Sequence, residues 1–470
     1  MPYLTTNKVC YLSLAVVLAS AGLAGSCYRQ PKAGPPRPAI PADFFALTIP
    51  AHPDIAGSSL YPSQLSLGAL GHPSTLAWGF IEREPHRYDF GAYDGWIRAA
   101  QQHGLVDSRG VVDVTVTFGY TPIWAAANTK GCQLMGDEDV CPSPPARLSD
   151  WTDLVTAVVR HYNGVTAPHV KYYELWNEFN ALNFWNGTQQ QMVDLAAAAY
   201  PIVHRDPYSQ LLTPSVAGPV VITGGAVPEG LGWMESYLRL GGARYADGGS
   251  FHGYVAAFGG QGLTLFPDPE QDGTSGCIPG SQCLGSIVRK VKSFRQVFDE
   301  NGLTGKPMLN TEGSWGKNTL LPNPDEQAEW VARWFVLQAN SYPALTQAAW
   351  YAWAWPSEAG QLQADEAGNL NAAGIAWNQV YRWLVGASFT ASCAVDDNST
   401  WTCPLSRGGG YRGLVVWNRA GPADYRPDPI YTTARDLKGL SMRIPVGQAI
   451  PISGAPLLLE YVGGNHALRY

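Results

Sequence analysis

The sequence predicts a (β/α)8 barrel followed by a small C-terminal β-sandwich. Between residues 43 and 385, eight short β-rich runs alternate with helical segments, an order typical of a parallel α/β barrel. From residue 386 to residue 470 only short β runs follow, separated by Gly, Pro, Asn and Asp. A chain of 470 residues, 46% of them hydrophobic, is long enough to bury both cores.

The eight predicted barrel strands are mostly apolar, as expected for strands that are buried on both faces. They are Phe45–Ile49, Ser66–Leu70, Val112–Phe118, Val170–Trp176, Leu211–Ser215, Gly249–Tyr254, Pro307–Thr311 and Ala348–Trp353. An open parallel sheet is the alternative fold, but no glycine-rich phosphate loop joins a strand to a helix. The barrel is therefore the preferred interpretation.

The predicted helices begin with residues that suit a helix N-terminus. Ser149-Asp150 and Thr188 precede two of them, and Pro324 lies at the start of a third, where its fixed backbone angle is favourable. The helices are expected over Trp151–Tyr162, Gln189–His204, Glu326–Asn340 and Ile375–Leu384. In the C-terminal domain, strands are expected over Ser388–Val395, Arg412–Trp417, Leu440–Ile444 and Leu457–Tyr461.

The N-terminal residues are expected to direct export. Lys8 precedes an apolar run, and small residues lead up to Cys27, which is the pattern of a secretory signal over residues 1–27. The run is short for a membrane span, and no later segment resembles one. A lipid anchor on Cys27 is an open alternative, so the expected location is secreted, periplasmic or at the cell surface. Prolines in residues 28–42 predict a stiff linker.

Six further cysteines form three local pairs and predict three disulfides. Each pair brackets a loop-like stretch, as expected in an oxidising compartment. The pairs are Cys132 with Cys141, Cys277 with Cys283, and Cys393 with Cys403. None has the close spacing of zinc ligands, so no metal site is expected.

Charge and aromatic content narrow the classes of partner. The formal net charge is −7, from 31 basic and 38 acidic residues, and no block of basic residues occurs. A nucleic-acid partner is therefore not expected, because phosphate binding needs concentrated positive charge. The chain has 17 tryptophans and 23 tyrosines. Their flat rings suit the apolar faces of sugars, although core packing also uses them.

Two glutamates at the ends of predicted strands are the candidate catalytic residues. Asn177 and Glu178 follow the fourth strand, and Glu312 follows the seventh. In a barrel the carboxyl ends of the strands meet on one face. Two facing carboxyl groups can break a glycosidic bond if one is protonated and donates to the leaving oxygen while the other is ionised and attacks the sugar carbon. Their surroundings must therefore separate their pKa values.

The stretch from about residue 45 to residue 385 resembles the retaining glycoside hydrolases of clan A, and within it the xylosidases and exopolysaccharide hydrolases of family 39. The resemblance rests on three motifs, Lys171–Asn180, Ser250–Tyr254 and Lys306–Gly313. It implies that Glu178 is the acid/base and Glu312 is the nucleophile. It implies an oligosaccharide or polysaccharide substrate and no cofactor.

The same resemblance implies several sugar contacts. Asn177 would bind the 2-hydroxyl, Tyr254 would hold the nucleophile, and Trp353 would match the sugar platform of strand eight. Trp124 lies in a stretch that resembles the end of strand three, and Trp185 lies in the loop after strand four. The residues expected to contact substrate are Asn177, Trp124, Trp185, His252, Tyr254 and Trp353.

Four residues depart from the family pattern or fall outside it. Phe179 stands where relatives usually carry proline, and Gly71-His72 stands where they often carry an arginine. His72 has no matched partner in the sequence, and Glu174 inside the fourth strand is expected to be structural. The preferred hypothesis is a secreted retaining β-glycosidase. The alternatives are a catalytically silent carbohydrate-binding barrel and, third, a surface adhesion protein held by Cys27.

Overall fold

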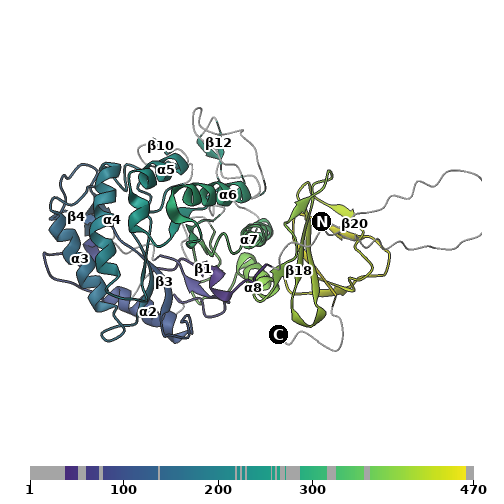
Figure 1. The fold of residues 1–470 in the computed structure, drawn as a ribbon. Coiled ribbons are helices and arrows are strands. Elements are labelled where there is room, and N and C mark those ends of the chain that lie inside the picture. Colours follow the sequence, from purple (N-terminus) through teal and green to yellow (C-terminus); the bar gives the residue numbers. More distant parts are fainter. Residues whose placement is uncertain are drawn as a thin grey trace, which may run out of the picture. The chain divides into compact units, whose positions relative to one another are not determined.

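Eight parallel strands form the central sheet of the computed structural model, and their order in the sheet follows their order in the chain (Figure 1). They are β1 (Phe45–Leu47), β2 (Ala69–Leu70), β3 (Val112–Thr117), β7 (Val170–Glu174), β8 (Gln210–Leu212), β11 (Gly249–His252), β14 (Met308–Glu312) and β15 (Gln347–Trp350). β1 pairs with β15, and Leu212 of β8 bridges Gly248 just before β11. The sheet therefore closes on itself, which confirms the predicted barrel.

The structure describes the chain from Arg37 to Tyr461 with gaps. The described residues are 37–50, 55, 60–72, 78–135, 138–217, 220–222, 225–227, 230–255, 257–259, 262–264, 270, 286–314, 324–353 and 360–461. The predicted signal over residues 1–27, its Cys27, and most of the linker over residues 28–42 lie outside this set. No helix among the described residues combines the length and the apolar character needed to cross a bilayer.

All eight predicted strands occur, but most end earlier than predicted. The apolar run after β7, for example, continues as buried loop through Leu175 and Trp176. Burial on both faces explains the apolar composition, because helices cover the outside of the sheet and side chains fill its inside. An apolar run indicates that residues are buried, not that they belong to a strand. Because the buried residues continue past the last strand hydrogen bond into the loops, the predicted strands are too long.

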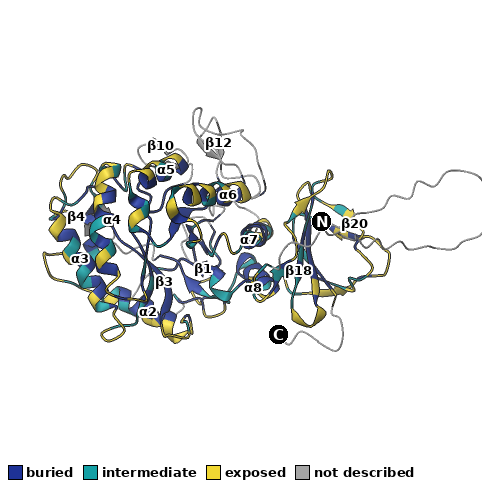
Figure 2. Cartoon of the chain, viewed as in Figure 1, coloured by how far each residue is buried: buried dark blue, intermediate teal, exposed yellow. Residues whose placement is uncertain are grey.

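Helices surround the sheet, and Figure 2 shows buried residues on their inner faces and exposed residues on their outer faces. They are α1 (Trp78–Ile81), α2 (Gly91–Gln102), α3 (Leu148–His161), α4 (Gln189–Val203), α5 (Leu231–Arg239), α6 (Ile287–Phe298), α7 (Pro324–Ala339) and α8 (Ala372–Leu384). Shorter helical turns are η1 (Ala42–Phe44), η3 (Gly242–Tyr245), η4 (Asp299–Leu303) and η5 (Gly408–Gly410).

The capping chemistry predicted from the sequence holds for one helix and fails for another. Thr188 accepts a hydrogen bond from the Gln191 backbone, and the Gln191 side chain accepts one from the Thr188 N–H, a complete capping box at the start of α4. Helix α3 begins earlier than Ser149-Asp150 predicts. Arg147 is its N-terminal boundary and has no side-chain cap, and Asp150 in the first turn pairs with Arg147 instead.

Three small β elements extend the loops of the barrel. Strands β4 (Thr121–Pro122), β6 (Glu138–Cys141) and β5 (Gln133–Met135) form one sheet, in that order. The hairpins are β9 (Val220–Ile222) with β10 (Gly225–Val227), and β12 (Ala257–Gly259) with β13 (Gly262–Thr264).

Two of the three predicted disulfides lie within the described residues, and both are present. One joins Cys132 to Cys141, and the other joins Cys393 to Cys403. The third was predicted between Cys277 and Cys283. Both Cys277 and Cys283 lie outside the described residues, so their disulfide stays a prediction.

The C-terminal residues form a β-sandwich with a core of its own. Its larger sheet has the order β16 (Ser388–Phe389), β18 (Thr400–Ser406), β19 (Arg412–Asn418), β24 (Leu457–Tyr461), β21 (Thr433–Arg435) and β22 (Ser441–Arg443), and β17 (Ala394–Val395) pairs with β18. A second pair joins β20 (Ala423–Tyr425) to β23 (Ile450–Ile452). Ile450 and Ile452 pack with Val416 and Leu459 between the two sheets. The sandwich is confirmed, although β18, β20, β21 and β23 were not predicted.

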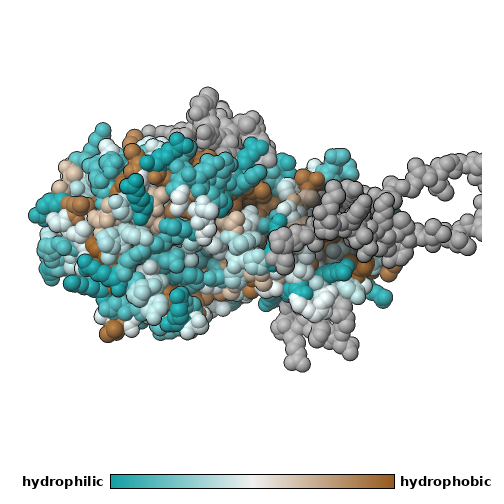
Figure 3. Space-filling view, viewed as in Figure 1, coloured by the Kyte–Doolittle hydropathy of each residue, from teal (hydrophilic) through white to brown (hydrophobic). Residues whose placement is uncertain are grey.

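The sandwich is attached to the last barrel helix through Arg407. Its guanidinium donates hydrogen bonds to the carbonyl oxygens of Arg382, Trp383 and Val385 at the end of α8. Carbonyls at a helix end have no partner within the helix, so this arginine satisfies them. The face seen in Figure 3 is mainly hydrophilic, with apolar residues scattered over it, as is usual for a folded domain.

The capping box predicts a measurable share of the stability. Thr188→Ala should lower the free energy of unfolding by about 1 kcal/mol, because the Gln191 N–H loses its acceptor. Urea unfolding followed by circular dichroism measures this change. Thr188→Ser keeps the hydroxyl and is the matched control, so equal stability of the two variants would contradict the role of the cap.

Candidate active site

The carboxyl ends of four barrel strands bring together one cluster of ionisable side chains. His252 is the last residue of β11, and Glu312 is the last residue of β14. Glu178 lies in the loop after β7, and His72 lies just after β2. All four belong to the barrel face where the loops after the strands gather.

His252 lies between the two glutamates. Its Nδ1 is 2.7 Å from Oε1 of Glu178 and 3.4 Å from Oε2 of Glu312. The His252 side chain is fully buried. A single imidazole therefore contacts both carboxyl groups that the sequence had singled out, although they are distant in the chain.

Both carboxylate oxygens of Glu312 accept further hydrogen bonds. Nε2 of His72 lies 2.9 Å from Oε2, and the hydroxyl of Tyr254 donates to Oε1. The expectation that His72 lacks a partner is wrong, because Glu312 is its partner across the barrel. The expected contact between Tyr254 and Glu312 is present. These bonds fix the orientation of the carboxylate.

The backbone at Glu178 is held in an uncommon conformation. Its φ angle is 42°, in the left-handed region that residues with a Cβ seldom occupy. Ser215, just after β8, holds it there: its hydroxyl accepts from the Glu178 N–H at 3.1 Å, and its carbonyl accepts from the Phe179 N–H at 3.1 Å. Such conformations persist where the surroundings impose them, and they concentrate at functional sites.

Asn177 has one free polar atom. Its Nδ2 donates to the hydroxyl of Tyr120 at 2.9 Å, while its Oδ1 is buried and has no hydrogen-bond partner among the described residues. Buried acceptors usually have partners, so this oxygen is available to a ligand hydroxyl.

Burial and neighbouring charges shift the pKa values of the two glutamates in opposite directions. Burial raises the pKa of Glu178, and the negative charge of Glu312 raises it too, while His252 opposes both. Burial would also raise the pKa of Glu312, but the charge of His252 and the contacts with His72 and Tyr254 outweigh burial and lower it to about 2. Glu312 is therefore held ionised, whereas Glu178 is shifted toward its protonated form.

The neighbouring carboxylates raise the pKa of both histidines. Burial alone would lower the pKa of His252, but the charges of Glu312 and Glu178 raise it to about 9. Burial also lowers the pKa of His72, but the hydrogen bond and charge of Glu312, together with the charge of Glu174, raise it above its usual value. The neighbouring carboxylates therefore favour the protonated form of both imidazoles, and with a pKa of about 9 His252 is charged at neutral pH.

A buried glutamate supports the two histidines from within the barrel. Glu174, the last residue of β7, is fully buried and accepts hydrogen bonds from Thr117 at 2.7 Å and from Thr311 at 2.8 Å. Its negative charge raises the pKa of His72 and of His252. The sequence assigned Glu174 a structural role, and these contacts add an electrostatic one.

The same cluster could hold a metal ion by position alone. Ligand atoms of His72, His252 and Glu312 lie within 4.8 Å of one another. A histidine binds a metal through a neutral nitrogen, however, and the carboxylates raise the pKa of both imidazoles, which favours their protonated form over metal binding. Glu312 contacts both imidazoles, and the buried Nε2 of His252 has no hydrogen-bond partner among the described residues.

The tryptophans expected to contact substrate, Trp124, Trp185 and Trp353, are buried or half-buried in the structure. Trp353 is fully buried in the core, and Trp185 is 2% exposed and packs against Trp176. Both rings are covered by neighbouring residues, and their contact with substrate stays a prediction. Trp124 is half-buried, packs against Trp78 and donates to the carbonyl of Glu82.

Other aromatic residues interact with the glutamates electrostatically. The phenol of Tyr120 is influenced electrostatically by Glu178 and Glu312, and Tyr351, which follows β15, acts on the phenols of Tyr120 and Tyr254. Tyr351 was not predicted from the sequence, because the resemblance to the family pointed only to Trp353 at the end of this strand. Tyr120 belongs to the segment after β3 that the sequence analysis had matched, but no role was assigned to it.

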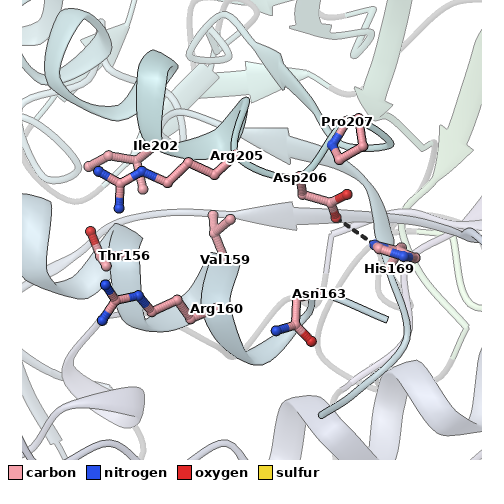
Figure 4. Close-up of a pocket in the computed structure, with 9 residues that line it drawn as sticks. All are labelled: Thr156, Val159, Arg160, Asn163, His169, Ile202, Arg205, Asp206 and Pro207. Atoms are coloured by element: carbon pink, nitrogen blue, oxygen red, sulfur yellow. Dashed lines mark hydrogen bonds and ion pairs between the residues drawn. The ribbon is translucent and has the colours of Figure 1, made fainter. Parts of the chain in front are cut away.

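Figure 4 shows the residues that line a separate hollow of about 230 Å³. It lies between the ends of α3 and α4, and its residues include Arg160, Arg205 and the hydrogen-bonded pair His169–Asp206. His169 comes just before β7, whereas Glu178 follows that strand. This hollow is therefore distinct from the glutamate site.

Comparisons with known proteins agree with this architecture. No protein-family model matches the sequence. A β-xylosidase from Geobacillus stearothermophilus is 32% identical over 128 residues, which cover 24% of this chain and 23% of that protein. The match thus spans about a quarter of the length of this curated relative.

Two solved structures are similar over most of their length. A family 39 glycoside hydrolase from Bacteroides cellulosilyticus WH2 has 19% identity and a TM-score of 0.65, covering 89% of this chain and 81% of its own. A family 39 enzyme from Xanthomonas axonopodis pv. citri has 15% identity and a TM-score of 0.58, covering 90% and 95%. The resemblance to family 39 is confirmed at the level of the fold.

The charge on His252 predicts a pH-dependent stability. Because its pKa rises from 6.5 to about 9 on folding, the folded chain keeps a proton that the unfolded chain loses. Stability should therefore fall as pH increases from about 6.5 to 9, and His252→Gln should flatten this decrease. Urea unfolding across that range measures it. The control is His86→Gln at an exposed position. If the free energy of unfolding changed with pH by the same amount in wild type and in His252→Gln, the raised pKa of His252 would be contradicted.

Proposed function

We propose that this chain is a retaining β-glycoside hydrolase that acts on an oligosaccharide or polysaccharide. The observation that carries the proposal is the contact of His252 with both glutamates. Because Oε1 of Glu178 and Oε2 of Glu312 touch the same nitrogen, they are at most about 6 Å apart. Retaining enzymes have a separation of about 5 Å, whereas inverting enzymes need about 6.5–9.5 Å to admit a water molecule.

The first half of the proposed reaction breaks the glycosidic bond. Glu178 donates its proton to the leaving oxygen, and an Oε atom of Glu312 attacks the anomeric carbon from the opposite face. The bond to the leaving group breaks as the ester to Glu312 forms. The raised pKa of Glu178 and the lowered pKa of Glu312 support this division of roles.

The second half releases the sugar. Glu178, now ionised, removes a proton from a water molecule, which attacks the anomeric carbon and displaces Glu312. Glu178 regains its proton and Glu312 regains its charge, so the site returns to its starting state. Two displacements at one carbon retain the anomeric configuration.

The surrounding residues take positioning roles in this proposal. His72, His252 and Tyr254 hold Glu312 in its ionised form and fix its orientation. The free Oδ1 of Asn177 supports a hydrogen bond to the sugar 2-hydroxyl, as its resemblance to the clan A motif implies. The β-xylosidase match and the family 39 fold support a glycosidase over a silent binding barrel.

We also propose that the chain works outside the cytoplasm. The disulfides Cys132–Cys141 and Cys393–Cys403 support this location, because such bonds persist in oxidising compartments. The signal pattern over residues 1–27 supports export in the same way. A lipid on Cys27 stays a prediction, and the mass of the mature N-terminal peptide measures it.

Substitution of each glutamate should give a different kinetic result. Glu312→Gly should lower kcat for aryl β-glycosides at least about a thousandfold, because no nucleophile remains. Glu178→Ala should slow substrates with basic leaving groups far more than those with acidic phenols, which leave without a proton. Glu84→Gln, at an exposed position, is the control and should keep the wild-type rate. Full activity of Glu312→Gly, or sugar binding without turnover in the wild type, would remove the proposal.

The pH profile should respond to His252. The positive charge of His252 lowers the pKa of both glutamates. His252→Gln should therefore raise both pKa values and move both limbs of the kcat/KM profile to higher pH. Rates measured with one aryl glycoside from about pH 3 to pH 10 would test this. An alkaline limb that stays in place or moves to lower pH would mean that His252 does not act on the acid.

A further inference from the structure

A large hollow of about 1040 Å³ lies far from the glutamate pair. Lys306 and Thr346 line it just before β14 and β15 begin, whereas Glu312 is the last residue of β14. The hollow is therefore at the amino ends of the strands, on the barrel face opposite the candidate active site. Trp401 of β18 lines it from the sandwich.

Positive charge dominates the lining of this hollow. Its charged residues are Arg37, Lys292, Arg295, Lys306 and Asp299. Arg295 pairs with Asp299 at 2.7 Å, which leaves three cations without a carboxylate among the lining residues. This local excess stands out on a chain whose net charge is −7.

Two of these cations are fixed in place by neutral acceptors. Arg37 donates to the carbonyl of Asn340 and to the hydroxyl of Ser392, each at 2.9 Å. Lys306 donates to the carbonyl of Ala246 at 2.5 Å. Because these acceptors carry no charge, they hold the side chains in position and leave the positive charge for a ligand. The exposed amine of Lys292 pairs with no described residue.

An aromatic ring lies in the same lining. Trp401 is half-buried and stacks on Trp417, with ring centres 5.6 Å apart and ring planes 4° apart. A neighbouring hollow of about 430 Å³ is lined by three cations, Arg289, Lys292 and Arg419, and by one carboxylate, Glu270. The two hollows share Val288, Lys292 and Trp401, and together they are called the basic groove.

We propose that this basic groove binds a chain of an acidic polysaccharide whose sugars carry carboxylates. The ring of Trp401 suits the apolar face of a sugar, and the cations suit the carboxylates of neighbouring units. A glycan held there would leave the glutamate face open. The groove would therefore tether the protein to a polyanionic glycan, whatever bond the glutamates cleave.

Binding of the full chain to polygalacturonate, with neutral xylan as comparison, tests the proposal. Titration calorimetry should detect binding to polygalacturonate only, and binding should weaken as ionic strength rises from about 0.05 M to about 0.5 M. Lys292→Glu should lower the affinity about fivefold, because it replaces an attraction by a repulsion. Lys130→Glu makes the same charge change at an exposed position outside the groove and should bind like wild type.

A second variant examines the aromatic ring, and a second assay separates this site from catalysis. Trp401→Ala should also weaken binding to polygalacturonate. If Trp401→Ala does not fold, Lys292→Glu still tests the proposal. Hydrolysis of a small aryl glycoside should be the same in wild type and Lys292→Glu. The proposal would be overturned if the chain bound polygalacturonate and xylan with equal affinity, or if Lys292→Glu and Lys130→Glu bound polygalacturonate equally well. It would also be overturned if single-stranded DNA bound more tightly than polygalacturonate and Lys292→Glu abolished that binding.

Discussion

The buried imidazole of His252, in contact with two carboxyl groups, is the interaction on which the candidate site depends. Burying charges is costly unless they are paired, and removing one partner of a buried pair typically costs about 3–5 kcal/mol. The positive charge of His252 makes it favourable to bury Glu312 as an anion. The same imidazole limits how far Glu178 can move from Glu312. One side chain therefore sets both the charge and the spacing of the pair.

The barrel supplies the geometry that this interaction needs. His252, Glu312 and Glu174 are the last residues of their strands, so closure of the sheet brings them together without a long ordered loop. Glu174, held by Thr117 and Thr311, adds a negative charge beneath the histidines. Ser215 after β8 fixes the backbone of Glu178. The strained φ at Glu178 is stabilised by neighbours that the closed barrel provides.

The strands and the two glutamates could be predicted from the sequence because both depend on local pattern. An apolar run indicates buried residues, and a polar motif directly after such a run indicates the end of a strand. The partner of His72 could not be predicted, because Glu312 lies 240 residues away and meets it only when the sheet closes. The burial of Trp353 could not be predicted either, because residue type does not reveal which side chains the core covers. In the sandwich, Pro404 interrupts the pattern of β18, which forms through its pairing with β19.

The central claim is that Glu312 is held as an anion close enough to Glu178 to act as the nucleophile. Covalent trapping tests it most directly. A 2-deoxy-2-fluoro β-glycoside with a good leaving group should form the ester and release it slowly, because fluorine disfavours the cationic transition state of the second step. Peptide mass spectrometry should then find the sugar on Glu312. Turnover of the parent glycoside with the label on another residue, or with no label at all, would contradict the account.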